Sequence, residues 1–136
     1  MRDDAAVVAA TRRWLERAVI GLNLCPFAKA VHVKRQIRYV VSAASHADAV
    51  LADLERELRT LVDSDPQQID TTLLMLPELF EDFLDFFFFL PEAEALLKRM
   101  ELDGTIQIAS FHPRYEFAGT DPDDVANCSN RAPYPT

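Results

Sequence analysis

The sequence contains very little glycine. Its 136 residues include only Gly21, Gly104 and Gly119, and these three are far apart. Loops that cradle phosphate groups need several glycines close together, so that backbone N–H groups reach the phosphate oxygens. The scarcity therefore excludes enzymes built on the dinucleotide-binding fingerprint or the P-loop. It leaves the cofactor, if there is one, unknown.

Histidine and cysteine are also too sparse for a local metal motif. His32, His46 and His112 show none of the short spacings that pair two ligands on one element. A zinc site would have to combine His112 with distant carboxylates. The candidates are Asp121, Asp123 and Asp124. We therefore expect no metal site.

Long apolar runs and a cysteine framework are missing as well. The richest apolar stretch, residues 73–90, is interrupted by one proline and four carboxylates, so it cannot cross a bilayer. The acidic N-terminus lacks the apolar core of a signal peptide. Cys25 and Cys128 are too few and too far apart to suggest a disulfide scaffold. We expect a soluble, cytoplasmic protein without a membrane segment.

Acidic residues outnumber basic ones, and the formal net charge is −8. Such a surface repels a phosphate backbone unless a basic patch overrides it. One short basic cluster occurs, and we interpret it as a solvated turn before a strand. Its members are Lys29, Lys34, Arg35 and Arg38. We expect no nucleic-acid partner.

Three segments have the composition of strands. Residues 37–41 are β-branched and aromatic, and residues 71–76 are apolar without alternation. Residues 105–111 are predicted to be the third strand. Helical patterns separate them. This alternation predicts one α/β domain over residues 1–136, with a small three-stranded, at least partly parallel sheet covered by amphipathic helices. A ferredoxin-like α+β arrangement is the alternative.

Four segments have apolar residues at helical spacing. The first begins near Asp3 or Asp4 and ends near Gly21 or Asn23. The others are expected at residues 47–62, 79–87 and 91–100. Ser45-x-x-Asp48 resembles a capping box for the second of these helices. Pro91 is expected to open the last helix, and Gly104 suits the position after its end.

The sequence Phe111-His112-Pro113 is placed where a ligand site is expected. It follows the last predicted strand, and ligands in open α/β sheets bind beyond the carboxyl ends of strands. His112 is a candidate catalytic acid, base or ligand. The alternative is a structural ring that caps the strand end through backbone hydrogen bonds. Arg114 and Tyr115 are candidate ligand-binding neighbours.

The C-terminal loop supplies further candidates. Arg131 has a guanidinium fork that suits a carboxylate or phosphate, although such forks also lock loops. Asn130 and Tyr134 flank it and are candidate binding residues. Together with His112 they predict a site for a small anionic ligand, with or without catalysis. No catalytic motif identifies a reaction.

Cys25 precedes Pro26, which favours the first position of a helix. A thiol at a helix N-terminus gains thiolate character, which makes Cys25 a candidate nucleophile. The alternative, which we favour, is a buried and inert cysteine.

The run of four phenylalanines, residues 86–89, cannot lie on one face of a helix. Core filling is the favoured interpretation, and a contact in a homo-oligomer is the second. The second interpretation implies a non-enzymatic interaction or regulatory module, which competes with the small-molecule site.

Several motifs together resemble one bacterial family, known as domain of unknown function 1415. They occupy residues 21–28, 71–74, 82–86, 104–113, 115–120 and 130–135. The resemblance implies no activity. It does imply a leucine-rich, helical segment after Pro135, so we expect this chain to lack a C-terminal helical segment. Cys25 belongs to the family motif and Cys128 does not, which argues against a disulfide between them.

Overall fold

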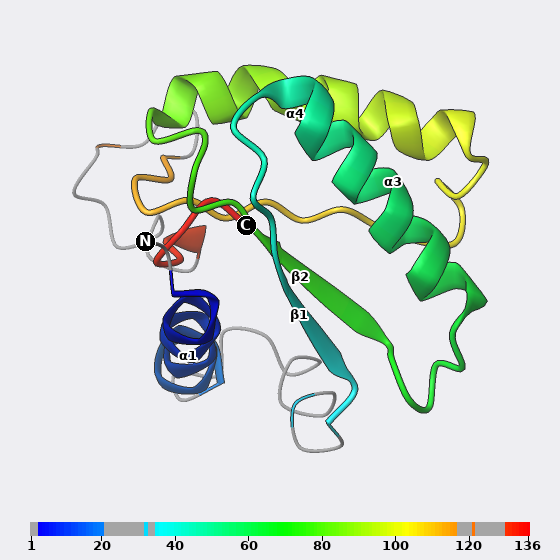
Figure 1. Cartoon of the computed structure of the whole chain (residues 1–136), viewed down its shortest axis with the longest axis horizontal. Coiled ribbons are helices and arrows are strands. Elements are labelled where there is room, and N and C mark those ends of the chain that lie inside the picture. Colours follow the sequence, from blue (N-terminus) through cyan, green and yellow to red (C-terminus); the bar gives the residue numbers. More distant parts are fainter. Residues whose placement is uncertain (1–2, 21–31, 33–34, 117–120, 122–129) are drawn as a thin grey trace.

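The computed structural model describes residues 3–20, 32, 35–116, 121 and 130–136. A β-α-β unit lies at its centre. Strand β1 (Ile37–Val41) leads through helix α3 (Ala47–Asp63) to strand β2 (Thr71–Met75), and the two strands pair in parallel from Ile37 opposite Thr71 to Val41 opposite Met75. Helix α3 lies with helix α4 (Phe83–Arg99) on one face of this sheet, and helix α1 (Asp4–Trp14) lies on the other face (Figure 1). The structure therefore has the expected α/β character.

Helix α1 (Asp4–Trp14) continues into a π-helix, η1 (Leu15–Ile20). Together they form the first helix that the sequence predicted. The Asp3 side chain caps α1 by accepting a hydrogen bond from the Ala6 N–H (3.2 Å). The Arg12 guanidinium lies 4.9 Å from the centre of the Tyr39 ring of β1. These contacts place α1 on the sheet face opposite α3.

Helix α4 (Phe83–Arg99) is one helix, and the predicted break at Pro91 was wrong. Proline lacks an N–H and leaves the carbonyl of Phe87 without its helical donor. Pro91 and Phe87 are both exposed, so water can hydrate this carbonyl. Because the missing bond lies on the solvent side, the proline interrupts the hydrogen-bond ladder without ending the helix.

Two predicted helix caps were also wrong. The N-cap of α3 is His46 rather than Ser45, and its side chain accepts a hydrogen bond from the Ala49 N–H. After α4, Glu101 takes the left-handed position (φ 58°) that Gly104 was expected to supply. The Glu101 N–H donates to Lys98 O (3.0 Å) and the Leu102 N–H to Leu97 O (3.1 Å). These two bonds close the helix end as a Schellman motif.

The predicted third strand, residues 105–111, is not a regular strand. The sheet of the described residues has two strands, β1 and β2. Burial nevertheless alternates along residues 105–110, with Ile106 and Ile108 packed against the core. The segment passes beside β2 beneath α4 (Figure 1). Its ladder is incomplete because, among the described residues, its backbone pairs with another extended segment only at Phe111, which exchanges two hydrogen bonds with Thr136 (both 2.9 Å).

The core lies between the sheet and the helices α3 and α4. Among the described residues, two clusters of buried apolar side chains lie there. The first contains Ala44, Val50, Leu76, Phe86, Phe89 and Ala93, and the second contains Leu58, Leu96 and Leu97. Within the described ranges, none of the helices has both the length and the apolar character that a bilayer crossing requires.

Candidate functional site

The two motifs that predicted a site, residues 111–115 and 130–136, lie against each other. The His112 N–H donates to the carbonyl of Asn130, and the Asn130 side-chain amide donates to the carbonyl of Ser110, both at 2.9 Å. The Arg131 Nε donates to the carbonyl of Tyr115 (3.0 Å). The fold therefore brings His112, Tyr115, Asn130 and Arg131 into one corner, as a shared site requires.

The His112 ring is buried at the centre of this corner, with 1% of the residue exposed. It packs between the rings of Phe83 and Phe86, with centroid distances of 5.4 and 5.5 Å. Nδ1 accepts a hydrogen bond from the Arg114 N–H (2.9 Å), so Nε2 carries the proton and donates it to the carbonyl of Phe80 (2.7 Å). Both ring nitrogens are thus engaged by backbone groups.

The environment of His112 favours the neutral ring. Burial lowers the pKa of His112, and the Arg114 charge lowers it further, whereas the carbonyl of Phe80 and the Asp82 carboxylate act in the opposite direction. A neutral ring with both nitrogens engaged joins residue 80 to residue 114. This arrangement favours the structural interpretation of His112, because a proton-transfer group needs a nitrogen that faces a substrate.

The remaining candidate residues differ in their surroundings. Arg114 is exposed, whereas Tyr115 is half-buried and packs its ring against Phe83 (5.1 Å between centroids). Tyr134 is half-buried, and its carbonyl accepts a hydrogen bond from the Thr136 hydroxyl (2.8 Å). Cys25 lies outside the described residues.

The metal hypothesis gains no support from the described residues. Across residues 3–20, 32, 35–116, 121 and 130–136, no three histidine, cysteine, aspartate or glutamate side chains gather as metal ligands do. Asp121 is exposed, and Asp123 and Asp124 lie outside the described ranges.

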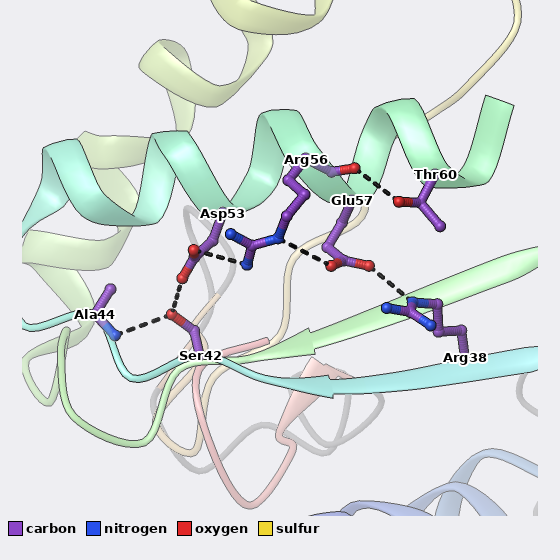
Figure 2. Close-up of polar contacts among 7 residues, drawn as sticks. All are labelled: Arg38, Ser42, Ala44, Asp53, Arg56, Glu57 and Thr60. Carbon is purple, nitrogen blue, oxygen red and sulfur yellow. Dashed lines mark hydrogen bonds and ion pairs between the residues drawn. The ribbon is translucent and has the colours of Figure 1, made fainter. Parts of the chain in front are cut away.

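A polar network between β1 and α3 escaped the sequence analysis (Figure 2). The buried Glu57 carboxylate (4% exposed) accepts a hydrogen bond from Arg38 Nε of β1 (2.9 Å) and lies 3.6 Å from Arg56 Nε. Arg56 also contacts Asp53 (2.8 Å). The buried Ser42 hydroxyl donates to Asp53 (2.6 Å). Two features of the sequence could have predicted this network. The spacing of residues 53, 56 and 57 places them on one face of a helix, and the predicted strand contains an arginine.

The charged groups of this network pair with one another. The Ser42 hydroxyl also accepts a hydrogen bond from the Ala44 N–H (3.1 Å), so it closes the turn after β1. Glu57, which would be costly to bury alone, is compensated by two guanidinium groups. The network therefore joins the sheet to α3, and it places no reactive group at the surface.

The outer face of α4 carries large apolar side chains in solvent. Leu84, Phe87 and Phe88 are 58%, 50% and 71% exposed, and their spacing places them on one side of the helix. Phe86 and Phe89, by contrast, are buried in the core. Two phenylalanines of the run therefore fill the core, as the favoured interpretation expected. The other two are exposed, as the second interpretation needs.

A groove of about 740 Å³ runs between β2 and residues 105–111. The faces of α3 and α4 that point toward the sheet form a further wall of the groove. Mainly apolar side chains contribute, among them Val50, Leu54, Leu58, Leu74, Phe86 and Phe89. The groove is separate from the outer face of α4, although both involve that helix.

Comparison with known proteins identifies a family. The family described as "Protein of unknown function (DUF1415)" matches residues 6–136, which is almost the whole chain. No curated protein and no solved structure matches the chain. The resemblance predicted from the sequence motifs is therefore confirmed, and the chain belongs to the DUF1415 family of proteins of unknown function.

Proposed function

We propose that the protein is an interaction module that associates with a second copy of itself through the outer face of α4. The observation that carries this proposal is the exposure of Leu84, Phe87 and Phe88 on one side of the helix. Contiguous exposed apolar side chains mark interaction surfaces, because leaving them in water costs free energy that association recovers. The anionic-ligand hypothesis has weaker support, since the nitrogens of His112 are engaged by the backbone.

The distribution of side chains along α4 favours a second copy as the partner. The N-terminal half of the outer face carries Phe87 and Phe88, and the same face continues at helical spacing to the exposed Pro91 and Ala95. In an antiparallel pair of α4 helices, the large side chains of one copy face the small side chains of the other. This is the self-complementary arrangement that a twofold interface requires.

The charges along α4 fit the same antiparallel arrangement. Asp85 lies in the first turn, and Lys98 and Arg99 lie in the last turn, where all three are exposed. Antiparallel pairing places the acidic end of one helix beside the basic end of the other. Complementary charges of this kind fix the register of an interface.

The test is the oligomeric state as a function of protein concentration, measured by sedimentation velocity. We expect the wild type to form a dimer as its concentration rises, and Phe88→Asp to weaken dimerisation by at least about tenfold, because it places a charge in the apolar contact. Val62→Asp is the matched control. It adds the same charge at another exposed apolar residue, on α3, and should dimerise as the wild type does.

Charge reversal tests the register. Asp85→Lys and Lys98→Asp should each weaken the dimer, and the double variant should restore it. A wild type that stays monomeric throughout the concentration range contradicts the proposal, and so does a Phe88→Asp variant that dimerises normally.

A further inference from the structure

We propose that the outer face of α1 is a docking surface for an acidic helical segment of a partner protein. This surface lies on the face of the sheet opposite α3 and α4, so it is independent of the association proposed for the outer face of α4 (Figure 1). The proposal depends on how the charges of the chain are distributed and on which basic side chains α1 presents to solvent.

The charges of the chain are strongly segregated along the sequence. Residues 1–38 contain eight of the 14 basic residues and three of the 22 acidic residues, so their formal charge is +5. Residues 39–136 contain the other six basic and 19 acidic residues, so their formal charge is −13. An asymmetry of this size in an acidic protein favours a local surface that meets an anionic partner.

Helix α1 and the π-helix that continues it present three arginines to solvent. Arg12, Arg13 and Arg17 are exposed, whereas Val7 and Thr11 of the same helix are buried. Arg13 and Arg17 are four positions apart, so they are neighbours on one side of the helix and repel each other. In the described part of the chain, neither of these two forms an ion pair. A bound anion would relieve this repulsion.

The other charged groups on this side already have partners. The Arg12 guanidinium lies 4.9 Å from the centre of the Tyr39 ring, and this contact holds it against β1. The Glu16 carboxylate, which follows the first two arginines on the same helix, lies 3.2 Å from Nε2 of His32. Glu16 is therefore engaged by another segment, and it leaves the guanidinium of Arg13 available to a partner.

The N-terminal half of α1 provides room for a helix beside these arginines. Ala6 and Ala9 precede Arg13 and Arg17 at helical spacing, so the four side chains follow one side of the helix. Ala6 is exposed and Ala9 is half-buried. Because alanine side chains are short, a second helix can pack here at the usual interaxial distance of about 8–10 Å.

Carboxylates on a partner helix can match the spacing of Arg13 and Arg17. Two glutamates four positions apart have Cβ atoms about 5–6 Å from each other, as the two arginines do. Each glutamate can then form a bidentate pair with one guanidinium. A long polyanion such as nucleic acid fits less well, because it would extend over the acidic remainder of the molecule. The occupant is therefore a helix with carboxylates one turn apart and apolar side chains beside them.

The probe is a fluorescently labelled, capped peptide of four Glu-Leu-Ala-Ala repeats, which places its glutamates one turn apart. Binding is followed by fluorescence anisotropy with the Phe88→Asp variant, so that association through α4 does not affect the result. We expect saturable binding that weakens at least about tenfold between about 0.05 and 0.5 M salt, because salt screens exposed charges. The added double substitution Arg13→Ala and Arg17→Ala should also weaken binding at least about tenfold at low salt.

Arg59→Ala is the matched control. It removes the same charge from an exposed helical arginine on α3, and it should bind the peptide as the parent variant does. Alanine favours helices, so melting temperatures should confirm that each variant is folded. A peptide of the same composition, with its glutamates in pairs two positions apart, directs them to opposite sides of its helix and should bind at least about tenfold more weakly.

Four outcomes overturn the proposal. They are the absence of saturable binding at low salt, equal weakening by Arg59→Ala, equal binding of the rearranged peptide, and tighter binding of a single-stranded DNA oligonucleotide of the same charge. The second and third would show attraction to charge alone. The last would show that the surface recognises phosphates instead of carboxylates.

Discussion

At the scale of single residues, the ring of His112 bonds to backbone groups at both of its nitrogens. Its ring joins the turn before α4 to the turn after residue 111 through two backbone hydrogen bonds. Replacing such a ring removes the hydrogen-bond partners of the Phe80 carbonyl and the Arg114 N–H. Each lost hydrogen bond costs about 0.5–1.5 kcal/mol.

Acidification should destabilise the protein through His112. Burial lowers the pKa of His112 in the folded state, whereas the unfolded chain titrates near about 6.5. The neutral ring therefore contributes its full stability above pH ~6.5, and this contribution is lost as the pH falls toward the lowered folded-state pKa. We expect the free energy of unfolding, from urea denaturation, to fall by up to about 1.4 kcal/mol per pH unit in this window.

Two variants test whether His112 causes this pH dependence of the free energy of unfolding. His112→Asn should flatten the slope while also lowering stability at neutral pH. His46→Asn should keep the slope, since asparagine is a good N-cap and His46 is exposed at the start of α3. A slope that survives in His112→Asn would show that another group is responsible.

The variant Arg131→Lys distinguishes two roles of Arg131, which are stabilising the loop through a hydrogen bond and binding an anionic ligand. The substitution keeps the charge and removes the Nε donor that bonds to the carbonyl of Tyr115. We expect thermal melts to show a loss of about 1.5–3 kcal/mol, the contribution of a hydrogen bond from a charged group. Small carboxylates and phosphates should shift neither protein. Arg114→Lys, at an exposed side chain, should stay within about 0.5 kcal/mol of the wild type.

The ligand hypothesis makes the opposite prediction for Arg131→Lys. The variant would melt as the wild type does, while a carboxylate or phosphate that stabilises the wild type would lose its effect. One set of melts therefore decides between the two roles.

At the scale of elements, the end of α4 holds a residue in an unfavourable conformation. Glu101 has φ 58°, a left-handed conformation that costs non-glycine residues about 1–2 kcal/mol. Glu101→Gly should therefore raise the free energy of unfolding by about 1 kcal/mol, with the Schellman bonds unchanged. Glu101→Ala should bring no such gain, because alanine keeps the Cβ atom. Equal effects of glycine and alanine would contradict this account.

At the scale of the whole molecule, α4 contributes to two surfaces at once. Its inner face carries Phe86 and Phe89 to the core and the groove, and its outer face carries Phe87 and Phe88 to solvent. The molecule as a whole is acidic, with a net charge of −8. Apolar contact drives the association proposed for the outer face, and the net charge of two acidic copies opposes it, so the local pairing of Asp85 with Lys98 and Arg99 matters for the register.

The sequence by itself determined much of the local structure. Apolar periodicity predicted α1 and α3, because a spacing of 3.6 residues decides which side chains share a helix face. Composition predicted both paired strands, from a β-branched and aromatic run and from an unbroken apolar run. The family followed from motifs that extend over most of the chain. The helix pattern also implied that four consecutive phenylalanines must divide between different faces of the helix. It did not predict that α4 continues through Pro91, because this depends on the proline lying toward solvent.

Only the tertiary structure decided which groups the described candidate site residues contact. The nitrogens of His112 are engaged by a carbonyl 32 residues away and by a turn that local spacing does not encode. Whether residues 105–111 form a strand depends on a neighbour, because a strand needs partners for its backbone groups. The same holds for Arg38, whose partner Glu57 comes from another element. Local patterns determine faces, whereas contacts between distant segments depend on how those faces pack.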